Sequence, residues 1–533
     1  MRKRILACLV SSMILASTAA CQTASTSSAQ SENAGGTSTP SAASTAATSS
    51  NESEKTSSAA SPKYVFLFIG DGMSYPQFQS AADCLGACAD DDYMQAEPSI
   101  EREDRGTAVL NGPSALNFMQ FETAGSAVTY DSCSFAPDSA STATSIATGY
   151  KTYSGMINVD ETGTTEYETI AEKLHEQKGW KIGVISSVNL NHATPAAFYA
   201  HQASRSNYYE IGLELIDSNF EYFAGGGLLK PTGADEDKDD LYQLAEAAGY
   251  KVTKTQADAE KLTADDGKVI AIDEHLADSS AMSYELDRSD DNWALADYVE
   301  KGIEVLDNDE GFFMMCEGGK IDWACHANDA GTTVNDTLAL ADAVQVAIDF
   351  AAEHPEETLI LVTGDHETGG LTIGFAGTDY DTYLTNLTSQ KISYSQFDTE
   401  YVEKYKENKT SFDDAMKDVE KLFGLKVKGD ENDKLVLTEY ELERLKTAYE
   451  LAMSDYDSSK YTQEQYVLYG SYNPFSVTVT HILNNKSGID FTSFSHTGLP
   501  VAVFADGAGA DSFGGYYDNT DIYKKMASLL DVK

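Results

Sequence analysis

Carboxylates and a histidine gather in the segment Cys316–His326, which follows a short apolar run that predicts a buried strand. Two glycines let the chain turn after that strand, and the segment carries Glu317, Asp322 and His326. Asp322 and His326 are four residues apart, so on a helical turn they share one face and can bind one ion. A carboxylate with an imidazole suits zinc, whereas a further carboxylate suits magnesium. An acidic loop without a metal is the alternative that this segment alone leaves open.

Three more apolar runs carry residues of the same chemical kinds at one end. Asp71 follows the first run, Asp365 and His366 follow the second, and His496 shortly precedes the third. The runs are Tyr64–Ile69, Thr358–Val362 and Leu499–Phe504. Open α/β sheets place their functional sites beyond the carboxyl ends of the strands. Together, the four segments predict a metal site rather than unrelated solvated loops.

Ser139 is the candidate nucleophile. It lies in a run of small residues from Asp138 to Thr144, ahead of a helix that we expect to end at Gly149. A helix N-terminus offers free N–H groups and a favourable dipole to a phosphate. Serine needs a base or a metal to react, and no G-x-S-x-G elbow surrounds Ser139, so a metal is the better activator. A simple helix-capping role for Asp138 or Ser139 is the alternative.

As a set, these segments resemble the motifs of the alkaline phosphatase family. The matching motifs are D-G-M at Asp71, D-S-A-S-T-A-T at Asp138, H-A-T-P at His192 with a downstream S-R at Arg205, E-G-G-K-I-D-x-x-x-H at Glu317, T-G-D-H-E-T-G-G at Thr363 and H-T-G at His496. They follow the family's order and span nearly the whole chain beyond residue 70. The resemblance implies a three-layer α/β/α sandwich and an enzyme that hydrolyses phosphate monoesters.

The resemblance also implies two zinc ions, one magnesium ion and a role for each matching residue. The implied ligand sets are Asp322, His326 and His496 for one zinc; Asp71, Ser139, Asp365 and His366 for the other; and Asp71, Thr194 and Glu317 for magnesium. Ser139 would be phosphorylated during turnover. Arg205 would bind two phosphate oxygens with its planar guanidinium, which favours monoesters over diesters.

Two further residues stand at positions that vary within the family. His192 lies two residues before Thr194, and we expect it to contact a metal-bound water rather than the metal itself. Trp323 stands where some relatives carry lysine or histidine, so a possible cation beside the phosphate is missing. Phosphate affinity and pH optimum therefore cannot be transferred from relatives.

The remaining chain predicts one large α/β domain with an insertion. Strands at Tyr64–Ile69, Lys181–Ser186, Phe312–Met315, Thr358–Val362 and Leu499–Phe504 alternate with helical stretches at 166–178 and Asn335–His354, which indicates a largely parallel sheet covered on both faces. Within the catalytic domain, 63–533, residues 375–490 change in composition and are expected to form an inserted cap. Helices are predicted there at Ser411–Phe423 and after Thr438, where Glu441 completes a capping box.

The N-terminus predicts export. Three basic residues and an apolar run indicate a signal peptide over residues 1–20, and Cys21 follows as in a bacterial lipoprotein. Residues 21–62 are rich in Ser, Thr and Ala, which is typical of a flexible tether. We expect a protein exported to the cell surface or periplasm and anchored through a lipid on Cys21, with ordinary secretion as the alternative.

Charge and cysteine content restrict the partners. The net charge of −48 opposes binding to nucleic acid or anionic lipid, so a lipid anchor would be the one membrane contact. The family resemblance implies small phosphate monoesters as the partners. Five cysteines follow Cys21, and among them Cys84 and Cys88 are close enough in sequence for a local disulfide. The family resemblance adds a homodimer as an expectation.

Three functions compete at this stage. Phosphate monoester hydrolysis is the preferred prediction. The same metal site could serve a phosphodiesterase or act on sulfate, but the chain lacks a C-x-P-x-R or S-x-P-x-R motif. The third alternative is a catalytically silent, tethered binding protein, which the intact set of metal-type residues disfavours.

Overall fold

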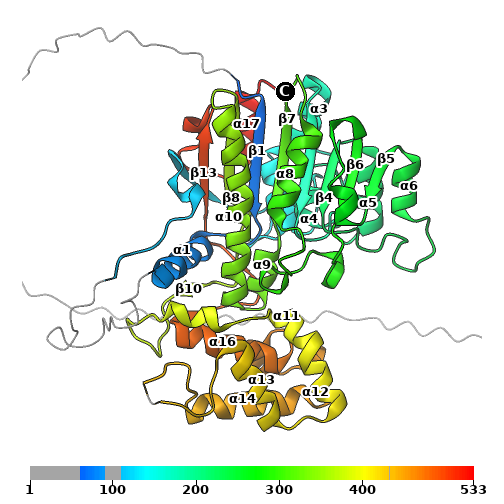
Figure 1. Cartoon of the computed structure of the whole chain (residues 1–533). Coiled ribbons are helices and arrows are strands. Elements are labelled where there is room, and N and C mark those ends of the chain that lie inside the picture. Colours follow the sequence, from blue (N-terminus) through cyan, green and yellow to red (C-terminus); the bar gives the residue numbers. More distant parts are fainter. Residues whose placement is uncertain (1–60, 90–109, 431) are drawn as a thin grey trace, which may run out of the picture. The chain divides into compact units, whose positions relative to one another are not determined.

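A ten-stranded sheet organises the described part of the chain, with strand order β14-β2-β13-β8-β1-β7-β3-β4-β6-β5 (Figure 1). The computed structural model describes residues 61–89, 110–430 and 432–533. The predicted signal peptide, Cys21 and nearly all of the predicted tether lie outside these ranges. The strands of this sheet are β1 (Tyr64–Gly70), β2 (Thr123–Val128), β3 (Lys181–Ser186), β4 (Tyr222–Gly225), β5 (Tyr250–Thr253), β6 (Lys268–Ile272), β7 (Phe312–Gly318), β8 (Thr358–Gly364), β13 (Val501–Gly507) and β14 (Gly515–Asp518).

Helices cover both faces of the sheet because its strands are apolar on both sides. In β1, Tyr64, Phe66 and Phe68 point to one hydrophobic cluster, whereas Val65 and its alternate neighbours point to a second. The first cluster packs against α1 (Tyr75–Ala89), α8 (Leu295–Leu306) and α10 (Ala330–Glu353). The second packs against α2 (Ser139–Thr148), α3 (Ile170–Lys178), α4 (Ala193–Ala196), α5 (Tyr208–Asp217), α6 (Leu241–Ala247) and α17 (Thr520–Leu529). The predicted three-layer α/β/α sandwich is confirmed.

Among the described strands of the sheet, β13 alone runs antiparallel to its neighbours, β2 and β8. The start of β13 therefore lies at the edge where the parallel strands end. Two short ladders extend this edge: β12 (His496–Thr497) pairs with β9 (Glu367–Thr368), and β10 (Thr372–Ile373) pairs with β11 (Ile489–Asp490). This reversal brings His496, which precedes its strand, to the same edge as residues that follow theirs.

The predicted strands agree with the observed ones except at their ends. The third predicted strand, Phe312–Met315, continues to Gly318, and the fifth begins at Val501 rather than Leu499. The helix predicted at 166–178 begins only at Ile170, because Thr169 caps it and forms a capping box with Glu172. The helix predicted at Asn335–His354 begins earlier, at Ala330, where Asp329 caps its first turn.

The inserted segment leaves and re-enters through the β10–β11 ladder, where Gly374 N–H donates to Gly488 O at 2.7 Å. It carries α11 (Tyr394–Phe397), α12 (Glu403–Asn408), α13 (Phe412–Phe423), α14 (Glu439–Ala452), α15 (Gln463–Tyr469) and α16 (Pro474–Ser487). The capping box of Thr438 and Glu441 at the start of α14 is present. Phe397 of this segment belongs to the same hydrophobic cluster as one face of the sheet.

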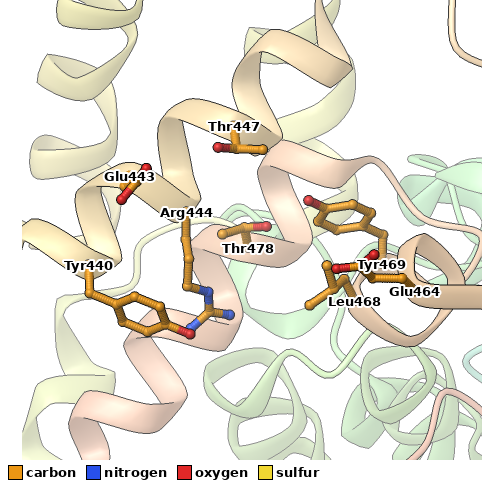
Figure 2. A pocket seen from close by; sticks show the side chains of 8 residues that line it. All are labelled: Tyr440, Glu443, Arg444, Thr447, Glu464, Leu468, Tyr469 and Thr478. Carbon is orange, nitrogen blue, oxygen red and sulfur yellow. The ribbon is translucent and has the colours of Figure 1, made fainter.

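Helices α14, α15 and α16 border a cavity of about 350 Å³. Arg444 and Tyr440 lie toward one end of it, and Glu464, Leu468 and Tyr469 toward the other (Figure 2). None of the cavity's lining residues is among the predicted site residues. The cavity therefore belongs to the insertion and not to the predicted metal site.

The five cysteines of the described part are all free, so the disulfide considered between Cys84 and Cys88 is wrong. Both residues lie on α1, where Cys84 is buried and its thiol contacts Leu384 O at 3.8 Å, while Cys88 is exposed.

The remaining short α-helices are α7 (Gln256–Ala259) and α9 (Lys320–His326). Among the described helices, none has the length and apolar composition that a membrane crossing requires.

Replacing Phe397 tests whether the insertion is part of the catalytic body. Phe397 is fully buried between Phe423 and Phe475, so Phe397→Ala should lower the free energy of unfolding by about 3–5 kcal/mol. All three tryptophans lie outside residues 375–490. If the insertion shares the core, their fluorescence transition in denaturant will shift together with the circular dichroism transition. A tryptophan transition that stays in place would show an independent domain, and the exposed Tyr440→Ala is the control.

Candidate metal centre

Three parallel strands end at the same level of the sheet and deliver most of the site. Gly70 at the end of β1 pairs with Gly318 of β7 and with Gly364 of β8. A Cβ on Gly364 would lie 2.0 Å from Met73 O, so only glycine allows this close approach. The next residues on β1 and β8 are Asp71 and Asp365, and the turn after β7 leads into α9.

Asp322, His326 and His496 converge as the sequence predicts. His326 Nε2 lies 3.3 Å from Asp322 Oδ2 and 3.1 Å from His496 Nε2, and His496 Nε2 lies 3.6 Å from Asp322 Oδ1. The Nδ1 atom of His326 donates to Phe494 O at 2.7 Å, and that of His496 donates to Pro137 O at 2.6 Å. Burial opposes a charge on His326, but Asp322 outweighs it and raises the His326 pKa to about 8. Metal binding requires neutral rings, in which both Nε2 atoms carry lone pairs that face each other. A cation between them would remove this repulsion.

A second group contains Asp71, Asp365 and His366, all fully buried. His366 Nε2 lies 3.2 Å from Asp71 Oδ1 and 3.4 Å from Asp365 Oδ2. The His366 ring also stacks on His496 at 3.7 Å, so the two groups adjoin, and Asp322, His366 and His496 likewise present ligand atoms within 4.8 Å of one another. Six side chains from distant parts of the chain thus form one cluster.

Ser139 is the first residue of α2 and lies against this second group. Its hydroxyl oxygen is 3.1 Å from His366 Nε2, and the residue is 1% exposed. The capping role belongs to Asp138, whose carboxylate accepts from Ser141 N–H. The Ser139 hydroxyl is therefore free to face the histidine and carboxylate cluster from the N-terminus of α2.

The third predicted set lies on the other side of Asp71. Thr194 Oγ1 is 3.5 Å from Asp71 Oδ2, and the Glu317 carboxylate accepts a short hydrogen bond from Ser186. Asp71 Oδ1 and Glu317 Oε1 are buried without a hydrogen-bond donor. His192 lies closer than the sequence suggests, because one of its ring nitrogens falls within 4.8 Å of ligand atoms of Asp71 and Glu317.

The hydrogen bonds of Arg205 decide what His192 can do. Arg205 Nη1 donates to Asp138 Oδ2 at 2.9 Å, and Nη2 donates to His192 Nε2 at 3.0 Å. Burial and the nearby guanidinium lower the pKa of His192 to about 3, so the ring is neutral. Because Nε2 accepts from Arg205, the ring proton lies on Nδ1, which is buried and unpaired. In this arrangement Nδ1 can donate to a water but cannot bind a cation.

The close packing of buried carboxylates in the cluster favours the binding of cations. Burial, together with repulsion from Asp365, Asp322 and Glu317, raises the pKa of Asp71 well above its usual value. Burial also raises the pKa of Asp365 to about 7 and that of Glu317 to about 8. Burial opposes ionisation of Asp322 as well, but the adjacent His326 outweighs it and lowers the Asp322 pKa. Close carboxylates cannot all ionise without compensating charge, so this donor set fits divalent cations.

Thr368 is a site residue that sequence reasoning missed. Its hydroxyl donates to Asp322 Oδ1 at 2.5 Å and lies 3.2 Å from His366 Nδ1, from which it can accept. One hydroxyl thus orients a ligand residue of each group and leaves the lone pair of His366 Nε2 toward Ser139. Thr368 stands inside the Thr363–Gly370 motif, but its type alone does not reveal this bridging position.

A family model described as alkaline phosphatase matches residues 62–532 of the chain. The chain belongs to the alkaline phosphatase family. Among curated relatives, alkaline phosphatase 3 of Bacillus subtilis (strain 168) is 30% identical over 402 residues, covering 74% of this chain and 77% of the relative. Alkaline phosphatase 4 of the same strain is 31% identical over 391 residues, covering 72% of this chain and 74% of the relative.

Solved structures agree with this assignment. The cold-active alkaline phosphatase of Shewanella sp. aligns with a TM-score of 0.67 at 28% identity, covering 88% of this chain and 99% of that chain. The Thermus thermophilus enzyme aligns with a TM-score of 0.69 at 21% identity, covering 89% of this chain and 92% of that chain, which supports the fold. This alkaline phosphatase is therefore an enzyme that hydrolyses phosphate monoesters.

Removing the Thr368 hydroxyl tests its bridging role. Thr368→Val keeps the side-chain shape but leaves Asp322 and His366 without their shared partner, so zinc affinity should fall about 10- to 100-fold. Calorimetric titration of metal-free protein with zinc measures this loss. Thr388→Val, which removes an exposed hydroxyl elsewhere, should bind zinc normally. Equal affinities for both variants would show that the bridge does not orient the ligands.

Proposed function

We propose that this alkaline phosphatase hydrolyses phosphate monoesters through a phosphoserine at Ser139, with two zinc ions and one magnesium ion. The observation that carries the proposal is the Ser139 hydroxyl, 3.1 Å from His366 Nε2 in the group with Asp71 and Asp365. The residues that would hold the ions are Asp322, His326 and His496 for one zinc; Asp71, Ser139, Asp365 and His366 for the other; and Asp71, Thr194 and Glu317 for magnesium.

The reaction would proceed in two displacements at phosphorus. In the first, Ser139 Oγ forms a bond to phosphorus while the bond from phosphorus to the substrate alcohol breaks. In the second, water displaces Ser139 and inorganic phosphate leaves. Bound divalent cations would supply deprotonated oxygen nucleophiles at neutral pH and neutralise negative charge on the phosphoryl group.

The protein's own groups would orient the phosphoryl group. The free N–H groups at the start of α2 lie beside Ser139 and favour an anion there. Arg205 uses two of its five N–H donors on Asp138 and His192, so three remain for phosphate oxygens. A monoester offers more free oxygens to this fork than a diester does, which supports monoesters as the substrate class.

The third site is proposed for magnesium because its donors are oxygen atoms. A variant of the alkaline phosphatase of the Antarctic bacterium TAB5 holds Mg in a site called M3. Here, the His192 Nδ1 proton would donate to a water in this site while Nε2 keeps Arg205 in place. His192 would thus contact the magnesium site without binding the ion.

Export and anchoring are proposed from the N-terminal composition alone. The apolar run before Cys21 and the Ser-, Thr- and Ala-rich residues after it support a lipid-anchored protein outside the cytoplasmic membrane. A homodimer is proposed by analogy with the alkaline phosphatase family alone. A monoesterase in this location would release phosphate from external esters before uptake.

A substrate comparison tests the proposed reaction. The chain without residues 1–62 should hydrolyse a chromogenic phosphate monoester faster than the matching diester or sulfate, and Ser139→Ala should lower kcat by at least about a thousandfold. Denaturing mass spectrometry after an acid quench should detect phosphate on the wild-type chain and not on Ser139→Ala. Faster diester turnover would favour a phosphodiesterase, and a fully metallated but inert wild type would indicate a binding protein.

Metal removal should destabilise the fold as well as abolish activity. Asp71, Glu317, Asp322 and Asp365 are buried within one cluster, and ions bound at 100 times their dissociation constant would contribute about 2.7 kcal/mol each. Differential scanning calorimetry should therefore show a lower Tm after chelation, and zinc with magnesium should restore it. An unchanged Tm would contradict the assignment of these carboxylates as ligands.

A further inference from the structure

Lys320 is a fully buried lysine for which the proposed reaction has no role. It is 1% exposed and begins α9, two residues before Asp322. Its ammonium group lies 3.2 Å from Asp278 Oδ1, a carboxylate from a distant loop whose side chain is 42% exposed. A buried lysine with one half-exposed partner is unusual, because burying a charge is costly unless it is well compensated.

Two aromatic rings add to the compensation that the nearby carboxylates of Asp336 and Asp287 also provide. Lys320 Nζ lies 3.7 Å from the centroid of the Tyr284 ring and 4.7 Å from that of the Trp323 ring. Both distances are within the range of an attractive cation–π interaction, which is strongest for tryptophan and for desolvated cations. Tyr284 is itself buried and its hydroxyl lies 3.2 Å from that of Tyr394. The Lys320 ammonium group therefore lies between Trp323 and the buried Tyr284 and contacts both rings.

Trp323 in turn supports the residue that holds the phosphate-binding arginine. The rings of Trp323 and His192 meet edge to face, with centroids 6.0 Å apart and an interplanar angle of 79°. His192 Nε2 accepts from Arg205 Nη2 at 3.0 Å. The other arm of Arg205 is held by Asp138. A continuous series of contacts thus runs from Lys320 through Trp323 and His192 to Arg205.

We propose that Lys320 is a positioning residue for phosphate binding, which fixes Arg205 through Trp323 and His192. The inference rests on the proposed function, because it takes Arg205 to bind the phosphoryl group. An arginine side chain loses much rotamer freedom when it is held in one geometry. Lys320 reduces that cost by preventing the Trp323 and His192 rings from moving. Its loss weakens phosphate binding, while the bond-forming step at Ser139 is less affected.

Calorimetric titration with inorganic phosphate tests this role independently of turnover. We expect Lys320→Met and Trp323→Leu each to weaken phosphate binding about tenfold, with KM rising in parallel and kcat changing less than threefold. Lys320→Arg keeps the charge and should bind phosphate within about threefold of the wild type. The control is Lys301→Met, since Lys301 is a buried lysine that contacts Glu304 and backbone carbonyls instead.

A double-mutant cycle separates positioning from general damage. In an Arg205→Ala background, Lys320→Met and Trp323→Leu should have no further effect on phosphate affinity, because the residue that they position is gone. Bound zinc, measured by elemental analysis, should equal that of the wild type. If Lys320→Met fails to fold, Trp323→Leu alone and in the Arg205→Ala background decides the question.

Several results would overturn the inference while leaving the proposed function intact. The first is that Lys320→Met binds phosphate as tightly as the wild type. The second is that Lys320→Met lowers phosphate affinity as much in the Arg205→Ala background as in the wild type. The third is that Lys320→Met loses zinc. Weak phosphate binding in Lys320→Arg equal to that of Lys320→Met would also contradict it. Failure of the wild-type protein to hydrolyse any monoester would instead refute the proposed function.

Discussion

The structure depends on holding four carboxylates together in a buried place. Asp71, Glu317, Asp322 and Asp365 meet at the edge where three parallel strands end. The described hydrogen bonds of two of them come from neutral donors: Asp365 accepts from Gly72 N–H, His366 N–H and the Thr142 hydroxyl, and Glu317 accepts from Ser186. Such donors fix the oxygens in space but add no positive charge. The fold therefore builds a buried cluster of carboxylates that fits divalent cations, and this requirement determines what the surrounding elements must do.

One antiparallel strand solves the geometric problem of the last ligand. A histidine that follows a parallel strand would arrive from the same side as Asp71 and Asp365. Because β13 runs the other way, His496 instead enters the edge from the loop that returns from the insertion, and its short ladder places it opposite Thr368. The long insertion can therefore occupy the space between His366 and His496 in the sequence without disturbing the distance between them in the fold.

The sequence predicts the strands and the residue types of the site because both depend on local patterns. Buried parallel strands are continuous apolar runs, and ligand residues next to them are visible as isolated acids and histidines. Three features escape that reasoning because they depend on tertiary packing. The bridging hydroxyl of Thr368, the approach of His192 to Asp71 and the burial of Lys320 are set by segments far apart in the chain. The predicted start of α3, at residue 166, is too early for a local reason. The capping box of Thr169 and Glu172 begins the helix at Ile170, although the apolar spacing extends further toward the N-terminus.

The acidity of the chain and the chemistry of its site are compatible because they act at different distances. A net charge of −48 repels phosphate esters at long range, but ions in solution screen this effect beyond about 8–10 Å. Inside the site the dominant charges are local, and the half-buried Arg205, whose side chain is 24% exposed, attracts an anion at short range, where ions in solution screen little. Lys320 lies at the far end of the same series of contacts. The chain thus places half-buried Arg205 and buried Lys320 in one series of contacts, where we propose that Arg205 binds the phosphate and Lys320 keeps Arg205 in position.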